Sequence, residues 1–127
     1  MANNIIIDTS VLINAQKGNK DTLVSFDKYK DQALISRMTA YELIYGSINK
    51  KEKELNKEFL GSLDIIEINE MISNYAYTIL DKYGLATRFG IIDAVIAATA
   101  IINKYPLWTL NIKHFSKIKE LELFNLD

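Results

Sequence analysis

Short apolar runs that do not alternate with polar residues recur along this chain, and segments with helical spacing separate them. Such runs are typical of strands that are covered on both faces. Strands that alternate with helices predict a parallel sheet between two helical layers. We therefore expect an α/β fold, a three-layer α/β/α sandwich around a central parallel sheet of four to five strands. The candidate strands are 4–7, 33–35, 65–68 and 107–109, with 121–124 alternating as an edge strand does.

Three segments between these runs carry clear helical patterns. Residues 51–60 form a charged segment with apolar residues at helical spacing. The repeat that begins at Ile72 extends to Gly84, a residue that suits a helix C-terminus. Residues 91–102 are apolar on every side, which predicts a helix buried in the middle of the domain.

The length of 127 residues allows one core, so residues 1–127 are expected to form a single domain. The chain has no cysteine and one histidine, which excludes disulfide scaffolds, thiol nucleophiles and zinc sites with several imidazoles. The net charge of −1 predicts no strong nonspecific attraction to nucleic acid. The N-terminus lacks the basic region of a signal peptide, and the stretch 91–102 is too short for a membrane span. We expect a cytoplasmic protein with no membrane contact.

Polar side chains follow the predicted strands where each strand ends. In parallel sheets these ends meet at one edge, which is where ligands bind. Three carboxylates and one amide are expected to converge there, and oxygen ligands of this kind suit Mg²⁺ or Mn²⁺. The residues are Asp8, Thr9 and Ser10 after the first strand, Ser36, Arg37 and Glu42 after the second, Thr109, Asn111 and His114 after the fourth, and Asp93 in the apolar helix.

Each of these residues, taken alone, also has an explanation that involves no ligand. Asp8 could cap the helix that follows it. Glu42 lies three residues after Thr39, which is the spacing of a capping box. Asp93 could stabilise a helix N-terminus through the helix dipole, and Asn111 could serve as a turn or cap residue. The joint placement at one edge favours a functional site.

Four blocks of this sequence resemble PIN-domain ribonucleases, and most closely the VapC-type toxins of VapBC toxin–antitoxin pairs. The blocks are 6–13, 39–46, 92–98 and 107–115, in this order over essentially the whole chain. The resemblance implies that the first and fourth strands are neighbours. It also implies that Asp8, Glu42 and Asp93 are acidic metal ligands, and that Thr9 or Ser10, together with Thr109, supply supporting hydroxyls.

The hypothesis is a Mg²⁺- or Mn²⁺-dependent endoribonuclease whose catalytic residues are Asp8, Glu42, Asp93 and Asn111. Many PIN nucleases carry a fourth acid where this chain has Asn111, so whether one or two metal ions bind stays open. Many toxin-type members also have Asn at that position. Two alternatives remain, a degenerate PIN module that only binds protein or RNA, and a structure-selective nuclease that acts on DNA.

The resemblance implies a VapB-like antitoxin as partner, a homodimer, and an RNA substrate such as tRNA or rRNA. RNA that approaches an acidic pocket needs cations or hydrogen-bond donors around it, and the candidates are Arg37, Arg88, Lys113 and His114, with Lys17 and Lys20 more loosely. Six apolar residues on two adjacent helices either face the core or form a groove for an antitoxin segment. They are Tyr41, Ile44, Tyr45, Ile48, Leu55 and Phe59.

Overall fold

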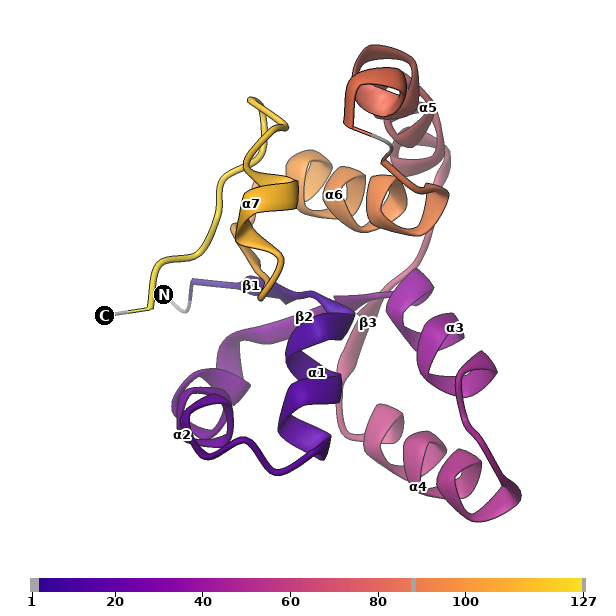
Figure 1. Ribbon diagram of the computed structural model, residues 1–127, viewed down its shortest axis with the longest axis vertical. Coiled ribbons are helices and arrows are strands. Elements are labelled where there is room, and N and C mark those ends of the chain that lie inside the picture. The colour runs from indigo at the N-terminus through magenta and orange to yellow at the C-terminus, as the bar shows by residue number, and fades with distance from the viewer. Residues whose placement is uncertain (1–2, 88, 127) are drawn as a thin grey trace.

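A parallel sheet of four strands forms the centre of the protein (Figure 1). The computed structural model describes residues 3–87 and 89–126. The strand order is β3-β2-β1-β4, and every pairing is parallel, as predicted. Ile6 of β1 pairs with Leu34 on one side and Leu107 on the other. The strands are β1 (Ile5–Ile7), β2 (Ala33–Ser36), β3 (Asp64–Ile66) and β4 (Leu107–Trp108).

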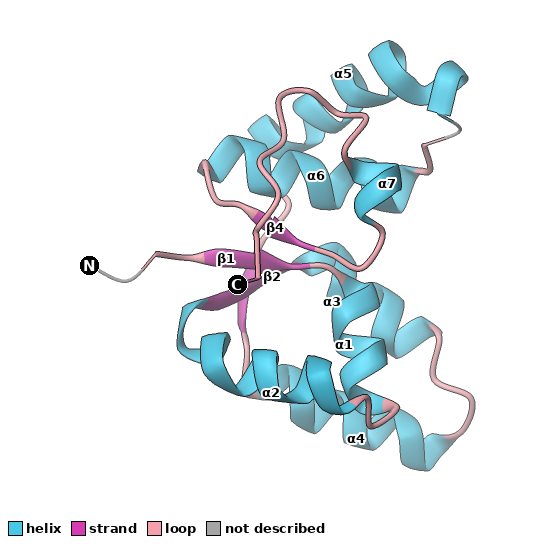
Figure 2. Ribbon diagram, turned by 60° about the vertical axis from the view of Figure 1, so that its left-hand side comes forward, coloured by secondary structure: helices cyan, strands magenta, loops and turns pink. Residues whose placement is uncertain are grey.

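Helices cover both faces of this sheet (Figure 2). On one side of the sheet lie α5, α6 and α7, and on the other lie α1, α2, α3 and α4. A short 3₁₀ helix, Lys30–Gln32, precedes β2. The helices are α1 (Thr9–Gln16), α2 (Lys20–Tyr29), α3 (Arg37–Tyr45), α4 (Lys50–Gly61), α5 (Glu70–Thr87), α6 (Ile91–Asn103) and α7 (Ile112–Phe115).

Two hydrophobic clusters, one on each face of the sheet, form the core. Successive side chains of a strand point to opposite faces. Ile6 accordingly packs with α5 and α6, while Ile5 and Ile7 pack with α1, α3 and Trp108. The predicted three-layer α/β/α sandwich is therefore confirmed, with four strands in its sheet.

The segment 121–124 is not the edge strand that its alternation predicts. It makes a single parallel bridge, between Leu107 and Leu123. The Leu107 N–H donates to the Glu122 carbonyl and the Phe124 N–H donates to the Leu107 carbonyl, so the pairing is confined to one residue of β4. Leu121 still packs into the core.

Two helix predictions also need correction. Helix α5 does not end at Gly84 but continues to Thr87. A glycine that ends a helix usually adopts a positive φ, and among the described residues Gly18 is the one glycine that does. Helix α6 is buried from Ala94 to Ala100, but its first turn is not, because the side chain of Ile91 is 68% exposed.

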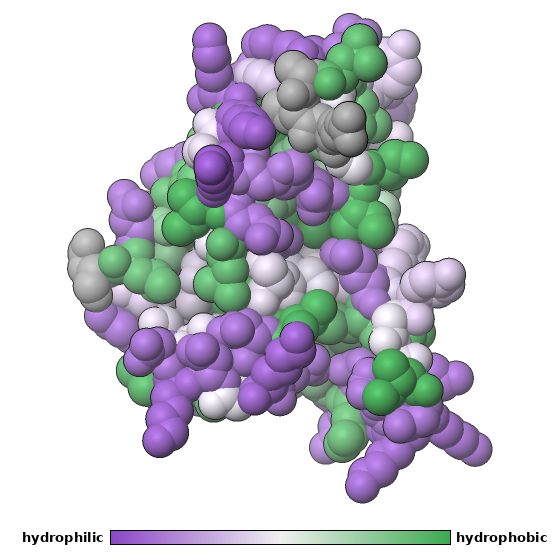
Figure 3. All heavy atoms as spheres, in the orientation of Figure 1, coloured by the Kyte–Doolittle hydropathy of each residue, from purple (hydrophilic) through white to green (hydrophobic). Residues whose placement is uncertain are grey.

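The surface in Figure 3 shows hydrophilic side chains over α2 and α4, while the hydrophobic ones form separate patches. In the part of the chain that the structure describes, no helix combines the length and the apolar character that a membrane crossing requires.

Candidate active site

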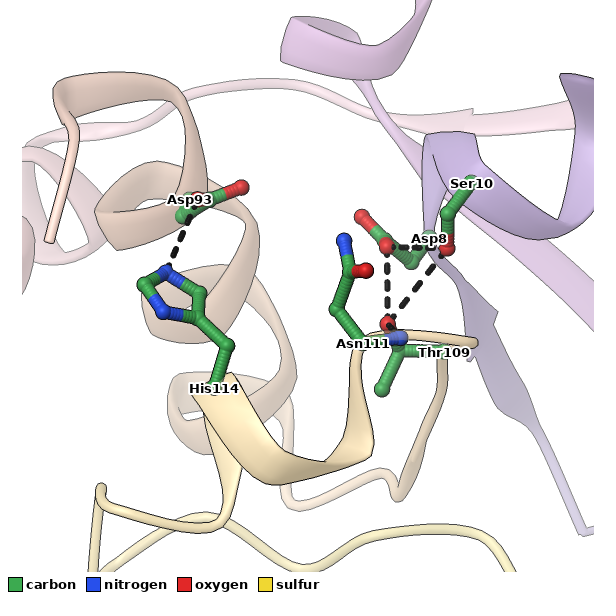
Figure 4. Close-up of polar contacts among 6 residues, drawn as sticks. All are labelled: Asp8, Ser10, Asp93, Thr109, Asn111 and His114. Atoms are coloured by element: carbon green, nitrogen blue, oxygen red, sulfur yellow. Dashed lines mark hydrogen bonds and ion pairs between the residues drawn. The ribbon is translucent and has the colours of Figure 1, made fainter.

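Asp8 lies where β1 ends, and its position depends on the pairing of β1 with β4. Its backbone N–H donates to the Trp108 carbonyl at 2.8 Å. Its buried carboxylate accepts two hydrogen bonds on Oδ2, from Ser10 Oγ at 2.6 Å and from Thr109 Oγ1 at 2.8 Å (Figure 4). Asp8 occupies the N-cap position of α1, yet its side chain makes no capping hydrogen bond. The carboxylate is therefore used for contacts across the site, and the capping interpretation is wrong.

The two hydroxyls that bind Asp8 also fasten the loop after β4. Ser10 Oγ accepts the backbone N–H of Leu110 at 3.1 Å, and Thr109 Oγ1 accepts that of Asn111 at 3.0 Å. Each hydroxyl therefore donates its proton to Asp8 and accepts a backbone N–H of the loop. Ser10 and Thr109 thus hold the carboxylate in one orientation.

Glu42 reaches the same edge of the sheet from the middle of α3. The Thr9 hydroxyl donates to Glu42 Oε1 at 2.6 Å and lies 3.0 Å from the buried Thr39 hydroxyl. The N-cap of α3 is Ser36, whose side chain accepts the backbone N–H of Met38. The capping-box interpretation of Glu42 is therefore wrong. The Thr9 hydroxyl donates to Glu42, while the Ser10 hydroxyl donates to Asp8.

Asp93 lies in the first turn of α6, where its charge also suits the helix dipole. Its Oδ2 lies 3.2 Å from His114 Nε2, and both side chains are about one-third exposed. This pair differs from the expectation that His114 contacts RNA. In the sequence, His114 follows Asn111 at a spacing of one helical turn, and this spacing is only a weak indication that His114 reaches the site.

The three carboxylates lie close enough for their charges to repel one another. Burial raises the pKa of Glu42 most; the Thr9 hydrogen bond opposes this, and the charges of Asp8 and Asp93 add to the rise. Burial also raises the pKa of Asp93, followed by the charge of Asp8, while His114 opposes it. The acids that the sequence predicts therefore share one electrostatic environment, as topology requires.

These carboxylates do not form a compact cage. Within residues 3–87 and 89–126, no three side chains of the His, Cys, Asp and Glu types meet at the spacing of a shared metal ion. Asp8 Oδ1, Glu42 Oε2 and Asp93 Oδ1 make no hydrogen bond within these residues. Mg²⁺ usually keeps several of its waters and binds through one or two carboxylates. An open set of carboxylate oxygens fits such a hydrated ion.

Asn111 lies between the two halves of this site. It is exposed and occupies the N-cap position of α7 without a capping hydrogen bond from its side chain. Figure 4 shows its carboxamide in the gap between Asp8 and the Asp93–His114 pair. The side chain is therefore placed to meet a ligand there, and it brings no charge.

The expected cationic rim is only partly present among the described residues. The guanidinium of Arg37 forms an ion pair with the Glu67 carboxylate, in which Nε donates to Oε1 at 2.8 Å. Arg37 is thus engaged by an acid within the chain. Lys113 is exposed on α7, and Arg88 lies outside the described residues.

Two apolar pockets flank α3. One, of about 510 Å³, lies beside Glu42 and includes Tyr41, Tyr45 and Ile92. The other, of about 490 Å³, lies between α3 and α4 and includes Tyr41, Ile44 and Leu60. The alternative in which all six apolar residues face the core is wrong, and one of the six, Ile48, lies in the loop between α3 and α4 instead of on a helix. Ile44 and Phe59 pack against the core, whereas Tyr41, Tyr45, Ile48 and Leu55 are exposed.

Comparisons with known proteins agree with this architecture. The model of the PIN domain family matches residues 5–121. Ribonuclease VapC1 of Methanocaldococcus jannaschii is 37% identical over 122 residues, which cover 94% of this chain and 84% of that protein. Ribonuclease VapC1 of Rickettsia felis is 35% identical over 130 residues, which cover 96% of each. Among solved structures, VapBC2 from Rickettsia felis bound to a promoter DNA fragment is similar with a TM-score of 0.77 and 30% identity, covering 97% of this chain and 98% of that one.

Proposed function

Since this chain belongs to the PIN-domain family, we propose that it is a VapC-type endoribonuclease that requires a divalent metal ion, Mg²⁺ or Mn²⁺. It hydrolyses RNA phosphodiester bonds as the toxin of a toxin–antitoxin pair, and it acts in the cytoplasm, where its RNA substrates are found. The observation that carries the proposal is the placement of Asp8, Glu42 and Asp93, from three separate elements, near enough at one edge of the sheet for the charge of Asp8 to raise the pKa of both Glu42 and Asp93, in addition to the effect of burial. Carboxylates packed in this way repel one another until a cation lies between them.

Asp8, Asp93 and Glu42 would hold the ion, either directly or through its waters. When bound, the ion polarises the scissile phosphate and lowers the pKa of a water molecule. The chain's own contribution is orientation. Ser10 and Thr109 fix the plane of the Asp8 carboxylate, Thr9 fixes Glu42, and the Asn111 carboxamide orients the attacking water. Cleavage of this kind leaves a 5′-phosphate and a 3′-hydroxyl.

RNA cleavage by the wild-type protein and by Asp8→Asn tests this proposal. Matched RNA and DNA oligonucleotides are incubated with Mg²⁺, with Mn²⁺ or with a chelator, and the products are resolved on gels. We expect RNA cleavage with metal only, and a rate about 10²–10³-fold lower for Asp8→Asn, the scale of losing a central electrostatic contact. Asp64→Asn, an exposed Asp of β3, is the matched control and should cleave as the wild type does.

Other results of this cleavage experiment would support a different function or remove Asp8 from the site. Preferential cleavage of DNA would support a structure-selective DNA nuclease. Folded wild-type protein that cleaves neither polymer with any metal would support a module that only binds protein or RNA. An Asp8→Asn variant as fast as the wild type would remove Asp8 from the catalytic residues.

We propose that the antitoxin, a VapB-like protein, places an amphipathic segment in the groove between α3 and α4. This groove is open and apolar, and Tyr45, which lines it, is 95% exposed. An apolar groove between two helices is a common receptor for such segments. A peptide of the antitoxin tail should slow hydrogen exchange in α3 and α4, whereas protection restricted to other helices would contradict this placement. We also propose a homodimer, which light scattering tests by mass.

A further inference from the structure

The one-turn helix α7 connects the two halves of the candidate active site. The backbone N–H groups of His114 and Phe115 both donate to the Asn111 carbonyl at 3.1 Å. The Asn111 N–H in turn donates to Thr109 Oγ1, which donates to Asp8. At the other end of the turn the His114 ring meets Asp93 (Figure 4). A continuous series of hydrogen bonds and one helical turn therefore runs from Asp8 to Asp93.

Aromatic packing confines the His114 ring. Its centroid lies 4.5 Å from that of Phe89, with the planes tilted by 37°, and 5.6 Å from that of Phe115 in an edge-on arrangement. Both phenylalanines are buried. A ring held in this way has few alternative rotamers, so the contact with Asp93 costs little further conformational entropy.

The contact engages one Asp93 oxygen and leaves the other available. His114 Nε2 faces Oδ2 at 3.2 Å, while Oδ1 makes no hydrogen bond within the described residues. Without this partner no hydrogen bond within the described residues fixes the orientation of the Asp93 carboxylate. Hydrogen-bond partners that orient metal-binding carboxylates typically contribute 10–100-fold to metal affinity or activity.

We propose that His114 is a positioning residue, which holds the Asp93 carboxylate in the orientation that binds the divalent ion. This inference rests on the proposed function of the site. It differs from the expectation that His114 contacts RNA, because a positioning role predicts a defect in ion binding before any RNA is added.

Two substitutions separate the hydrogen bond from the packing. His114→Phe keeps a ring against Phe89 but removes the nitrogen, while His114→Gln restores an N–H donor of similar reach. Lys113→Met changes the exposed neighbour on α7 and is the matched control for a role of this helix in RNA binding. His114→Leu is a second variant without the donor, and thermal melts check that every variant is folded.

The primary measurement is Mn²⁺ binding to the RNA-free protein, followed by electron paramagnetic resonance, with kcat and KM for RNA measured in parallel. We expect His114→Phe to bind Mn²⁺ about 10–100-fold more weakly than the wild type, and His114→Gln within about threefold of it. Cleavage by His114→Phe should fall at low Mn²⁺ and recover at saturating Mn²⁺, with an unchanged KM for RNA.

Mn²⁺ affinity within twofold of the wild type in both His114→Phe and His114→Leu would overturn the inference. So would an increase in the KM for RNA with unchanged Mn²⁺ affinity, since that result assigns His114 to the substrate. A wild-type protein that binds no Mn²⁺ would overturn the proposed function together with this inference. Wild-type binding with unaffected His114 variants would overturn the inference alone.

Discussion

The hydroxyl pair of Thr9 and Thr39 couples the stability of the α1–α3 contact to the placement of Glu42. Thr9 donates to Glu42 Oε1 at 2.6 Å, its hydroxyl lies 3.0 Å from that of Thr39, and both threonines are buried. Thr9→Val keeps the shape of the side chain and removes the hydroxyl. The substitution therefore deletes two contacts without opening a cavity.

Most of the expected loss in the free energy of unfolding comes from the Thr39 hydroxyl, which loses its hydrogen-bond partner. Glu42 is partly exposed, so water replaces some of its lost hydrogen bond. The Thr39 hydroxyl is wholly buried and would be left without a partner, which costs about 1–3 kcal/mol. We expect Thr9→Val to lower the free energy of unfolding by this amount, or roughly 3–5 °C in Tm for each kcal/mol. Replacing both partners by apolar groups of the same shape is nearly neutral, so Thr9→Val/Thr39→Val should recover at least half of the loss.

Urea denaturation of the wild type, the two single variants and the double variant measures these four free energies in one cycle. The reasoning predicts a favourable interaction free energy between the two substitutions. If the double variant were as unstable as the sum of the single ones, the two hydroxyls would act independently. If Thr9→Val were as stable as the wild type, the buried Thr39 hydroxyl would have another partner.

Two further predictions concern charge. In chelator at pH 7.5, Glu42→Gln should be more stable than the wild type, because the folded state disfavours the charged carboxylate. Thermal melts should show this gain disappear as the pH falls through 4.5, because Glu42 then becomes protonated in the folded and in the unfolded state. At pH 7.5, Mg²⁺ should reverse the difference by stabilising the wild type. A variant less stable than the wild type in chelator would contradict the raised pKa of Glu42. On the opposite face of the sheet from α1, the hydrogen bonds from Lys82 and Tyr83 lower the pKa of Glu120 to about 2, so the stability that they supply above pH 4.5 is lost as the pH falls towards 2. Lys82→Met should raise this pKa towards 4.5 in a carboxyl NMR titration, with little effect on stability because the pair is exposed. An unchanged pKa would assign the effect to Tyr83 alone.

The sheet could be predicted from sequence because β1 and β4 are buried on both faces and β2 is largely buried, which leaves uninterrupted apolar runs in the sequence. The pairing of β1 with β4 followed from the family resemblance, and it places Asp8 beside Thr109. The segment 121–124 shows where local patterns fail. Its alternation is real, but its pairing with β4 is confined to Leu107, and whether a segment pairs depends on a partner that lies outside the local sequence.

The division of work between Thr9 and Ser10 has a local cause. Consecutive residues on a helix point about 100° apart, so these two hydroxyls meet different partners, Glu42 and Asp8. The contact of His114 with Asp93 has no such local signal. It depends on how α7 packs against α6, and 21 residues separate the two side chains.

Anomalous diffraction from a Mn²⁺-soaked crystal of the wild-type protein shows directly where the ion binds. We expect one strong manganese peak beside Asp8, Glu42 and Asp93, with the ion bound by carboxylate oxygens directly or through its own waters. A peak that avoids these three side chains, or no peak at saturating Mn²⁺, would contradict this expectation.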